Sequence, residues 1–126
     1  MSSGGKLVAF FFQLSCQVKL YHWQTKSYAR HAATDKLHAQ IAEMSDRFIE
    51  VYAGKYGRSS LHINTKGALK VENLTDAQMK LYLGKTRDFL VAELPTLINP
   101  KDTDLLNLRD ELLGDINQCV YLFDLE

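Results

Sequence analysis

The apolar residues of this chain recur at steps of three and four, and this periodicity constrains the fold more than any other feature. Such spacing places the apolar side chains on one side of an α-helix. Three segments show it clearly, with Leu7, Phe11, Leu14, Val18 and Tyr21 in the first, Leu37, Ile41, Met44, Phe48 and Tyr52 in the second, and Leu105, Leu108, Leu112, Ile116, Cys119 and Phe123 in the third. The sequence therefore predicts an all-α fold.

Residues typical of helix ends place the boundaries of four predicted helices. The first covers about 20 residues, and the second runs from about residue 28 to 54, where Gly54 and Gly57 interrupt the pattern. The third opens at the capping box Thr75-Asp-Ala-Gln78, and Pro95 kinks or ends it. Its expected apolar residues are Leu81, Phe89, Leu90 and Leu94. Asp102 is expected to cap the fourth helix with its side chain.

The segment between the second and third helices, residues 57–73, breaks the helical pattern and is expected to be a long connector. The other two connections are short. A connector of about 18 residues can reach roughly 60 Å when extended, which is more than the length of the second helix. The prediction is a ferritin-like four-helix bundle with one long crossover, in which residues 1–126 form a single domain.

Composition and charge narrow the classes of function. Fifteen Lys and Arg balance fifteen Asp and Glu, so no net positive charge draws the chain onto nucleic acid or an acidic membrane, and DNA binding is expected to be weak. The apolar run from Leu7 to Phe12 is too short for a signal peptide or a membrane span. Cys16 and Cys119 are expected to be reduced and buried. These features predict a cytoplasmic protein without a membrane partner.

A second stripe lies on the side of the second helix that faces away from its apolar residues. Stepping about 100° per residue collects acidic residues, one histidine and small residues on this side. Its members are His31, Asp35, Ala39, Ala42, Asp46, Glu50 and Ala53. A solvated side would usually carry long charged side chains, so the alanines at its centre indicate that another helix approaches closely there.

The spacing within this stripe predicts a metal site divided between two chains. His31 with Asp35, and Asp46 with Glu50, are pairs four residues apart that can each bind one cation. The two pairs lie about 16 Å apart along the helix, too far for one ion within a chain. A two-fold mate whose second helix runs antiparallel, crossing near Ala39 and Ala42, would bring the pairs together.

One further residue completes the predicted ligand set. His22 stands near the end of the first helix, and the short turn that follows brings it towards the start of the second. Imidazole and carboxylate ligands without a thiolate suit Fe(II), Mn(II) or Zn(II). The predicted metal ligands are His22, His31, Asp35, Asp46 and Glu50.

The pattern His22-Trp23, His31-x-x-x-Asp35 and Asp46-x-x-x-Glu50 resembles the ferroxidase signature of mini-ferritins of the Dps type. The similarity covers residues 14–57, and the interval from His22 to His31 is shorter than that family usually has. The resemblance implies a ferroxidase that oxidises Fe(II) with hydrogen peroxide or oxygen and stores the ferric product, with the five predicted ligands as its catalytic residues. It also implies a homo-oligomer, a dodecameric shell built from two-fold dimers. In that family the two histidines and the first aspartate come from one subunit, and the later Asp and Glu come from its mate.

Two other interpretations stay open. A ferritin-like structural or assembly protein, DNA-associated or viral, would keep the fold without oxidising iron. Each pair taken alone could also be an ordinary helix-stabilising contact. His38 and His62 are interpreted as non-ligating, Trp23 as a packing residue, and residues 10–12 as core and subunit contacts. No Glu is followed by a His three residues later, which disfavours a di-iron site inside one bundle.

Overall fold

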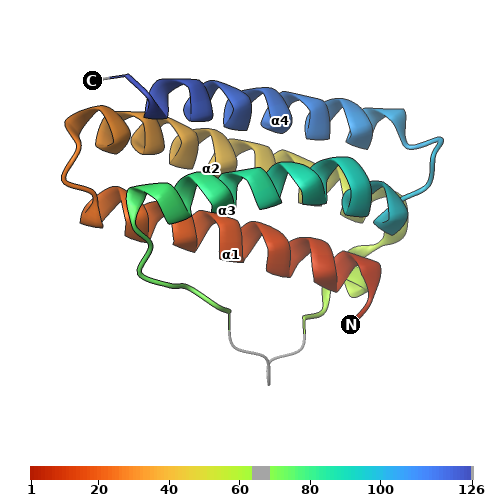
Figure 1. The fold of residues 1–126 in the computed structure, drawn as a ribbon. Helices are drawn as coiled ribbons and strands as arrows, with labels where there is room; N and C mark the ends of the chain where they lie inside the picture. The colour runs from red at the N-terminus through yellow and green to blue at the C-terminus, as the bar shows by residue number, and fades with distance from the viewer. Residues whose placement is uncertain (64–68, 126) are drawn as a thin grey trace.

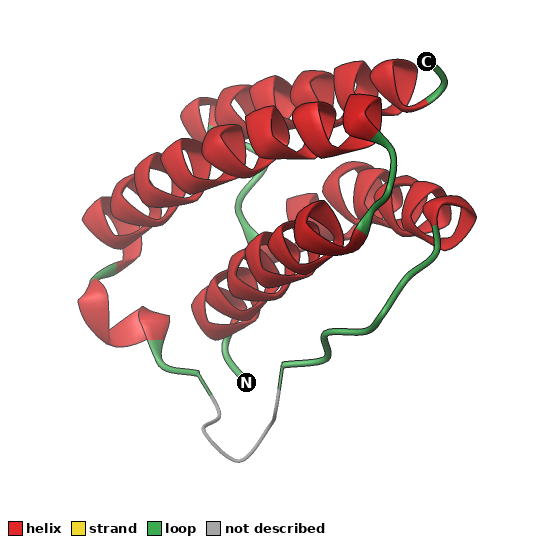
Figure 2. Cartoon of the chain, turned by 90° about the vertical axis from the view of Figure 1, so that its left-hand side faces the viewer, coloured by secondary structure: helices red, strands yellow, loops and turns green. Residues whose placement is uncertain are grey.

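Four long helices make up most of the chain in the computed structural model, which describes residues 1–63 and 69–125. They are α1 (Ser3–Gln24), α2 (Tyr28–Tyr56), α3 (Asp76–Asp88) and α4 (Thr103–Phe123). No strand occurs in the described residues, so the predicted all-α class is confirmed. In the bundle, α2 packs against both α1 and α4, and α3 packs against α4. Figure 2 shows α2 and α4 as one pair above α1 and α3. In Figure 1, α2 and α3 run in the same direction, while α1 and α4 run in the opposite one.

The apolar stripes of α1, α2 and α4 form the core of the bundle. Every residue of the three predicted stripes is buried, and none exposes more than 7% of its surface. Phe11 of α1 meets Phe48 of α2 with ring centroids 5.4 Å apart, and Tyr21 stacks on Phe123 of α4. The three predicted stripes are therefore confirmed. They are buried because a period near 3.6 residues keeps one side of each helix against its neighbours.

The predicted inner side of α3 is wrong at one position. Leu81 is 69% exposed, and the side facing the core carries Met79 and Leu83 instead. Two residues along a helix correspond to a rotation of about 200°, so Leu81 points away from both of its buried neighbours. The same rotation explains two further corrections. Cys16, two residues after buried Leu14, is exposed, and Trp23, two residues after buried Tyr21, is 68% exposed.

The helix that begins at α3 changes its winding before it stops, as the prediction for Pro95 implied. A π-helix, η2 (Phe89–Glu93), and a 3-10 helix, η3 (Leu94–Leu97), follow α3. The N–H of Leu94 bonds the carbonyl of Phe89, but Pro95 has no N–H to continue the series to Leu90. Arg109 of α4 supplies the missing donor, with its Nη1 2.9 Å from the Leu90 oxygen. Phe10 of α1 stacks on Phe89 with ring centroids 4.1 Å apart, so the partly buried rings connect α1 to η2.

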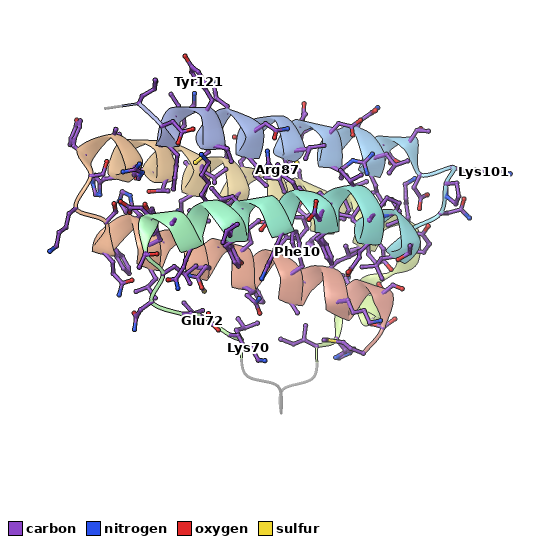
Figure 3. All side chains as sticks on the ribbon, in the orientation of Figure 1. Phe10, Lys70, Glu72, Arg87, Lys101 and Tyr121 are labelled. Atoms are coloured by element: carbon purple, nitrogen blue, oxygen red, sulfur yellow. The ribbon has the colours of Figure 1, made fainter. Side chains whose placement is uncertain are left out.

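The connector between α2 and α3 joins opposite ends of the bundle (Figure 1). α2 continues through Gly54 and ends at Gly57, whose φ of +88° favours glycine. A 3-10 turn, η1 (Arg58–Leu61), follows. Residues 64–68 of the predicted connector lie outside the described residues. Near α3 the chain runs beside α1 (Figure 3), where buried Gln17 forms two hydrogen bonds of 2.9 Å with the backbone N–H and carbonyl of Glu72.

The predicted caps of α3 and α4 have different outcomes. The capping box of Thr75 and Gln78 is present, and it is confirmed. Asp102 stands at the N-cap position of α4, but its side chain forms no capping hydrogen bond, so that prediction is wrong. The carboxylate instead accepts from Lys55 Nζ at 3.0 Å, from the N–H of Asn99 at 2.9 Å and from the Tyr56 hydroxyl. Asp102 thus fastens the end of α2 to the start of α4.

Two glycines permit a sharp stability test. A Cβ built on Gly4 would lie 2.1 Å from the carbonyl oxygen of Ser60, whereas one built on Gly54 meets nothing within 4 Å. We therefore expect Gly4→Ala to lower the free energy of unfolding by about 1–3 kcal/mol through overpacking. Gly54→Ala, the matched control inside α2, should raise it by about 0.5–1 kcal/mol. Urea denaturation of both variants measures the difference, and equal effects would contradict the close approach of α1 to η1.

No helix in the described residues has a stretch long and apolar enough to cross a membrane.

Candidate metal site

The turn between α1 and α2 brings two of the predicted ligands into contact. Thr25 ends α1, and the side chain of Ser27 caps α2 by accepting a hydrogen bond from the N–H of Arg30. This tight connection stacks the rings of His22 and His31, whose centroids are 3.9 Å apart at an interplanar angle of 18°. His22 is buried at 6% exposure, and His31 is exposed.

The two histidines hold each other through reciprocal backbone hydrogen bonds. His22 Nδ1 lies 2.8 Å from the carbonyl oxygen of His31, and His31 Nδ1 lies 2.9 Å from the carbonyl oxygen of His22. A carbonyl oxygen only accepts, so each Nδ1 carries the proton and donates it. In the neutral rings both Nε2 atoms then keep a lone pair. Metal-binding histidines have this arrangement, in which the second ring nitrogen donates to a carbonyl and fixes the tautomer.

The third predicted ligand lies beside this pair. Asp35 Oδ1 is 3.9 Å from His22 Nε2, which is too long for a hydrogen bond. Two ligands about 2.1 Å from a tetrahedral ion lie about 3.4 Å from each other. The Asp35 side chain is 69% exposed, so a small rotation of this carboxylate would close the difference. His22 therefore lies between the stacked ring of His31 and the carboxylate of Asp35.

Sequence reasoning did not identify Thr34, whose hydroxyl group lies against the ring of His22. Thr34 is completely buried and donates its hydroxyl hydrogen to the carbonyl of Arg30 at 2.7 Å. Its oxygen also lies 3.3 Å from His22 Nδ1, where it can accept part of that ring's hydrogen bond. The sequence signal was available, because Thr34 is one turn before Leu37 and lies on the side of α2 that faces α1.

The remaining two predicted ligands lie at the other end of α2. Asp46 and Glu50 are exposed, on the same outward side as Asp35 and away from the core. Their side chains are close enough that the Asp46 carboxylate raises the pKa of Glu50, through a hydrogen bond and through charge repulsion. Within one chain the structure does not bring this pair to the histidines. Among the described residues, no group of three or more His, Cys, Asp or Glu side chains is placed to hold a metal ion.

The alanines between the two pairs leave the middle of the outer side of α2 open. Ala39 and Ala42 are both exposed. Beside Ala42, α1 and α2 border a groove of about 650 Å³, lined by apolar side chains and by Glu43, Asp46 and Arg47. The outer side of α2 therefore has small residues at its centre and potential ligands towards both ends.

The remaining histidines and the cysteines lie outside the predicted ligand set. His38 Nε2 lies 3.3 Å from the hydroxyl of Ser15, and burial together with nearby Lys19 lowers the pKa of His38. His62 is exposed near η1. Burial raises the pKa of the Cys119 thiol to about 12, so this cysteine is an unreactive core residue. Only Cys119 fits the prediction of two buried cysteines.

Comparison with known proteins places the chain in a family. Residues 22–123 match the model of a family of unknown function, DUF5856, and the chain belongs to that family. An uncharacterized 14.6 kDa protein from the mobD-ri intergenic region of Enterobacteria phage T4 is 27% identical over 112 residues, covering 83% of this chain and 75% of the phage protein. No solved structure matches the chain.

This membership corrects the predicted resemblance to mini-ferritins of the Dps type. The resemblance rested on five potential ligands and one tryptophan within two helices. Pairs such as His31 with Asp35 and Asp46 with Glu50 also occur as ordinary contacts between residues four apart on a helix. A short pattern of this kind describes the face of a helix, and the rest of the sequence determines the family.

Proposed function

We propose that two copies of this chain share Fe(II)-binding sites along their α2 helices and oxidise the bound iron. The observation that carries this proposal is the reciprocal pair of hydrogen bonds between His22 and His31, which leaves the lone pairs of both Nε2 atoms available, with His22 Nε2 3.9 Å from Asp35 Oδ1. His22, His31 and Asp35 would bind Fe(II) as substrate together with the partner subunit's Asp46 and the partner subunit's Glu50. Zn(II) or Mn(II) would fit the same nitrogen and oxygen ligands.

The positions of the ligands along α2 support an antiparallel pairing. Asp35 and Asp46 each lie about 8 Å from the midpoint between Ala39 and Ala42, and His31 and Glu50 each lie about 14 Å from it. A two-fold axis at this midpoint therefore sets Asp35 against the partner subunit's Asp46 and His31 against the partner subunit's Glu50. Two equivalent sites result, and small Ala39 and Ala42 allow the helices to approach at the centre.

The ionisable side chains on the outer side of α2 are mainly acidic, with Asp35 in its first half and Asp46 and Glu50 in its second half. Antiparallel pairing would set Asp35 against the partner subunit's Asp46, and a cation bound between the two carboxylates would neutralise their like charges.

The connectivity of the bundle is the second support. The chain passes from one end of the bundle to the other between α2 and α3 (Figure 1), so that α2 and α3 run in the same direction. We propose that this is the ferritin-like connection, in which a single long crossover joins the second and third helices. In such bundles, residues on helix faces bind metal ions. This proposal concerns the topology alone and assigns no family.

The chemistry requires an external oxidant. Each Fe(II) gives up one electron, and one molecule of hydrogen peroxide accepts two to form two hydroxide ions. Two bound Fe(II) ions are therefore oxidised for each peroxide, and oxygen is the other candidate oxidant. The protein would hold Fe(II) with neutral imidazoles and carboxylates, ligands that also suit the Fe(III) product. Storage of the ferric product in a larger shell would follow assembly of the dimers.

A protein with the same assembly but no oxidation of iron is the second candidate. The 3.9 Å distance between His22 Nε2 and Asp35 Oδ1 favours it, because a tetrahedral ion would require the Asp35 carboxylate to move closer. DNA binding stays a minor expectation, since positive and negative charges balance.

Titration of the metal-free protein with Co(II) tests the proposed function. Co(II) bound by imidazole and carboxylate absorbs visible light, so the spectrum reports binding without any oxidation. We expect one Co(II) per chain, and then oxidation of Fe(II) when peroxide is added to the iron-loaded protein. Binding of Co(II) without oxidation of Fe(II) would support the second candidate. If the assembled protein takes up no Co(II) and no Fe(II), the shared site does not exist.

A further inference from the structure

The balanced total charge of the chain conceals an uneven distribution. The first 34 residues contain four lysine or arginine residues and no aspartate or glutamate, whereas the rest of the chain contains eleven basic and fifteen acidic residues. All of α1 and the first turns of α2 therefore lack acidic side chains. A difference of this kind between parts of a chain points to a polyanionic partner.

Two aromatic side chains flank the turn between α1 and α2 within this acid-free part. Trp23 is 68% exposed and Tyr28 is 84% exposed, and no other large hydrophobic side chain in residues 19–31 is exposed. Five residues span at most about 18 Å, so the two aromatic residues stand close together. They lie at the end of the bundle where α3 begins and α4 ends (Figure 1).

Two lysines accompany these rings. Lys19 Nζ lies 5.5 Å from the centroid of the Trp23 ring, and Lys26 is exposed in the turn between Trp23 and Tyr28. Within residues 1–63 and 69–125, neither lysine forms an ion pair with a carboxylate. Both ammonium groups can therefore contact an anion, and the four residues Lys19, Trp23, Lys26 and Tyr28 are called the turn patch below.

Acidic residues of the neighbouring elements limit the charge of the turn patch. Asp76 of α3 accepts a hydrogen bond from Arg30 Nη1 at 3.2 Å, so these two charges offset each other. Asp124 pairs with a lysine of α3 at 2.9 Å. Asp35 of α2 and Glu72 of the connector stay exposed. The local positive charge is therefore small, and binding must depend on the rings as well as on the lysines.

We propose that the turn patch binds single-stranded nucleic acid, with bases stacked on Trp23 and Tyr28 and phosphates in contact with Lys19 and Lys26. Exposed aromatic rings beside basic side chains bind single strands without reading their sequence. A duplex keeps its bases stacked inside, so the expectation of weak binding to double-stranded DNA is unchanged. The proposal does not depend on the binding of iron.

An anionic membrane is the other polyanionic surface that attracts aromatic and basic side chains. A helix that lies on a membrane inserts a continuous apolar side. The residues between the two rings are all polar, namely Gln24, Thr25, Lys26 and Ser27. Stacking requires only the faces of the two rings, so the composition of the turn patch favours the single strand.

Titration with a fluorescent oligo(dT) or oligo(rU) of about 20 nucleotides, longer than the roughly 4–16 nucleotides of known single-strand sites, tests the proposal. Trp23→Leu keeps an apolar side chain but removes the ring, so the dissociation constant should rise about 5- to 150-fold. Trp23→Phe keeps a ring and should bind nearly as the unchanged protein does. Tyr28→Leu should weaken binding in the same range. Both residues are exposed, so thermal unfolding should not change.

The salt dependence of binding reports the two lysines separately from the rings. The logarithm of the association constant for a single strand falls with a slope of about −0.7 per phosphate contact, so two contacts predict about −1.4. Lys26→Ala should reduce the slope to about −0.7. Lys101→Ala, which removes an exposed lysine at the opposite end of the bundle (Figure 3), should leave it unchanged.

Two results would overturn the proposal. The first is a protein that binds neither oligonucleotide, or that binds them equally well in Trp23→Leu, Tyr28→Leu and Lys26→Ala. The second is binding to vesicles of phosphatidylserine and phosphatidylcholine without binding to either oligonucleotide, which would identify the membrane as the partner. Binding to oligonucleotides by a protein that takes up no Co(II) would support the turn patch and contradict the metal site.

Discussion

Asp46→Ala is expected to abolish Fe(II) oxidation in the assembled protein, and Asp35→Ala should have the same effect. Loss of a group that merely supports a ligand commonly reduces metal affinity 10–100-fold, so loss of a ligand should reduce it by at least about 100-fold. Both residues are exposed and off the apolar side of α2, so the free energy of unfolding should change by less than about 0.5 kcal/mol. Co(II) absorption, Fe(II) oxidation and thermal unfolding measure the three quantities.

Asp88 is a suitable control for these variants. It is an exposed aspartate at the end of α3, far along the chain from the proposed ligands. Asp88→Ala should bind Co(II) and oxidise Fe(II) as the unchanged protein does. Full activity in Asp46→Ala would remove the second half of the proposed ligand set. An equal loss in Asp88→Ala would mean that the assay responds to overall charge and not to the site.

Ala42→Glu is expected to dissociate the assembly. Ala42 lies at the centre of the proposed contact between two α2 helices, and glutamate there would add bulk and bury a charge without a partner. We expect the dissociation constant to rise at least about a hundredfold, which corresponds to about 2.7 kcal/mol. Ala77→Glu, an equivalent change at an exposed position in the first turn of α3, should not change it. Sedimentation velocity over a range of concentrations measures both constants.

The Ala42→Glu result also separates folding from assembly. Because Ala42 is exposed in one chain, the variant should keep its helix content and its cooperative thermal unfolding. If Ala42→Glu associates as tightly as the unchanged protein, α2 does not form the two-fold contact. The register derived for the metal site would then be wrong.

The helices and most of the core were predictable because their signals are local and repeated. The stripes of α1, α2 and α4 each have five or six apolar residues at the helical period, and all of them are buried. α3 has a shorter regular helix, and its inner side includes Thr86, which is polar. With fewer apolar positions to define the direction, Leu81 was assigned to the core although its neighbours Met79 and Leu83 occupy it.

The residues of the candidate site could be predicted from the sequence, but their relative positions could be predicted only in part. Spacing along α2 placed Asp35, Asp46 and Glu50 on one side without any knowledge of tertiary structure. The stacking of His22 on His31 depends on the backbone path through Thr25 and Ser27. This path lets the backbone carbonyl of each histidine accept a hydrogen bond from the ring of the other. Such contacts across a turn leave no periodic trace in a sequence. The assignment to mini-ferritins failed for a related reason, since a few residues on one helix face do not specify a family.

The role of Asp102 at the start of α4 likewise could not be predicted from the sequence. An aspartate before a helix commonly caps it, and the sequence alone favoured that role. In the structure, Lys55 and Tyr56 at the end of α2 lie close to the start of α4 and bind the carboxylate instead. The choice between a cap and a contact between helices depends on which donors the fold brings near, and local sequence does not contain that information.

The central claim, that one metal site takes its ligands from two copies, is tested most directly by mixing Asp35→Ala with Asp46→Ala. Each variant alone lacks a carboxylate in both of its sites. In a mixed dimer, one site loses both aspartates and the other keeps the complete set of ligands. Once exchange of subunits has been shown with labelled chains, the mixture should bind Co(II) and oxidise Fe(II) at up to about one quarter of the unchanged level, because half of the dimers are mixed and each has one intact site. Exchanged assemblies that neither bind Co(II) nor oxidise Fe(II) would contradict the shared site.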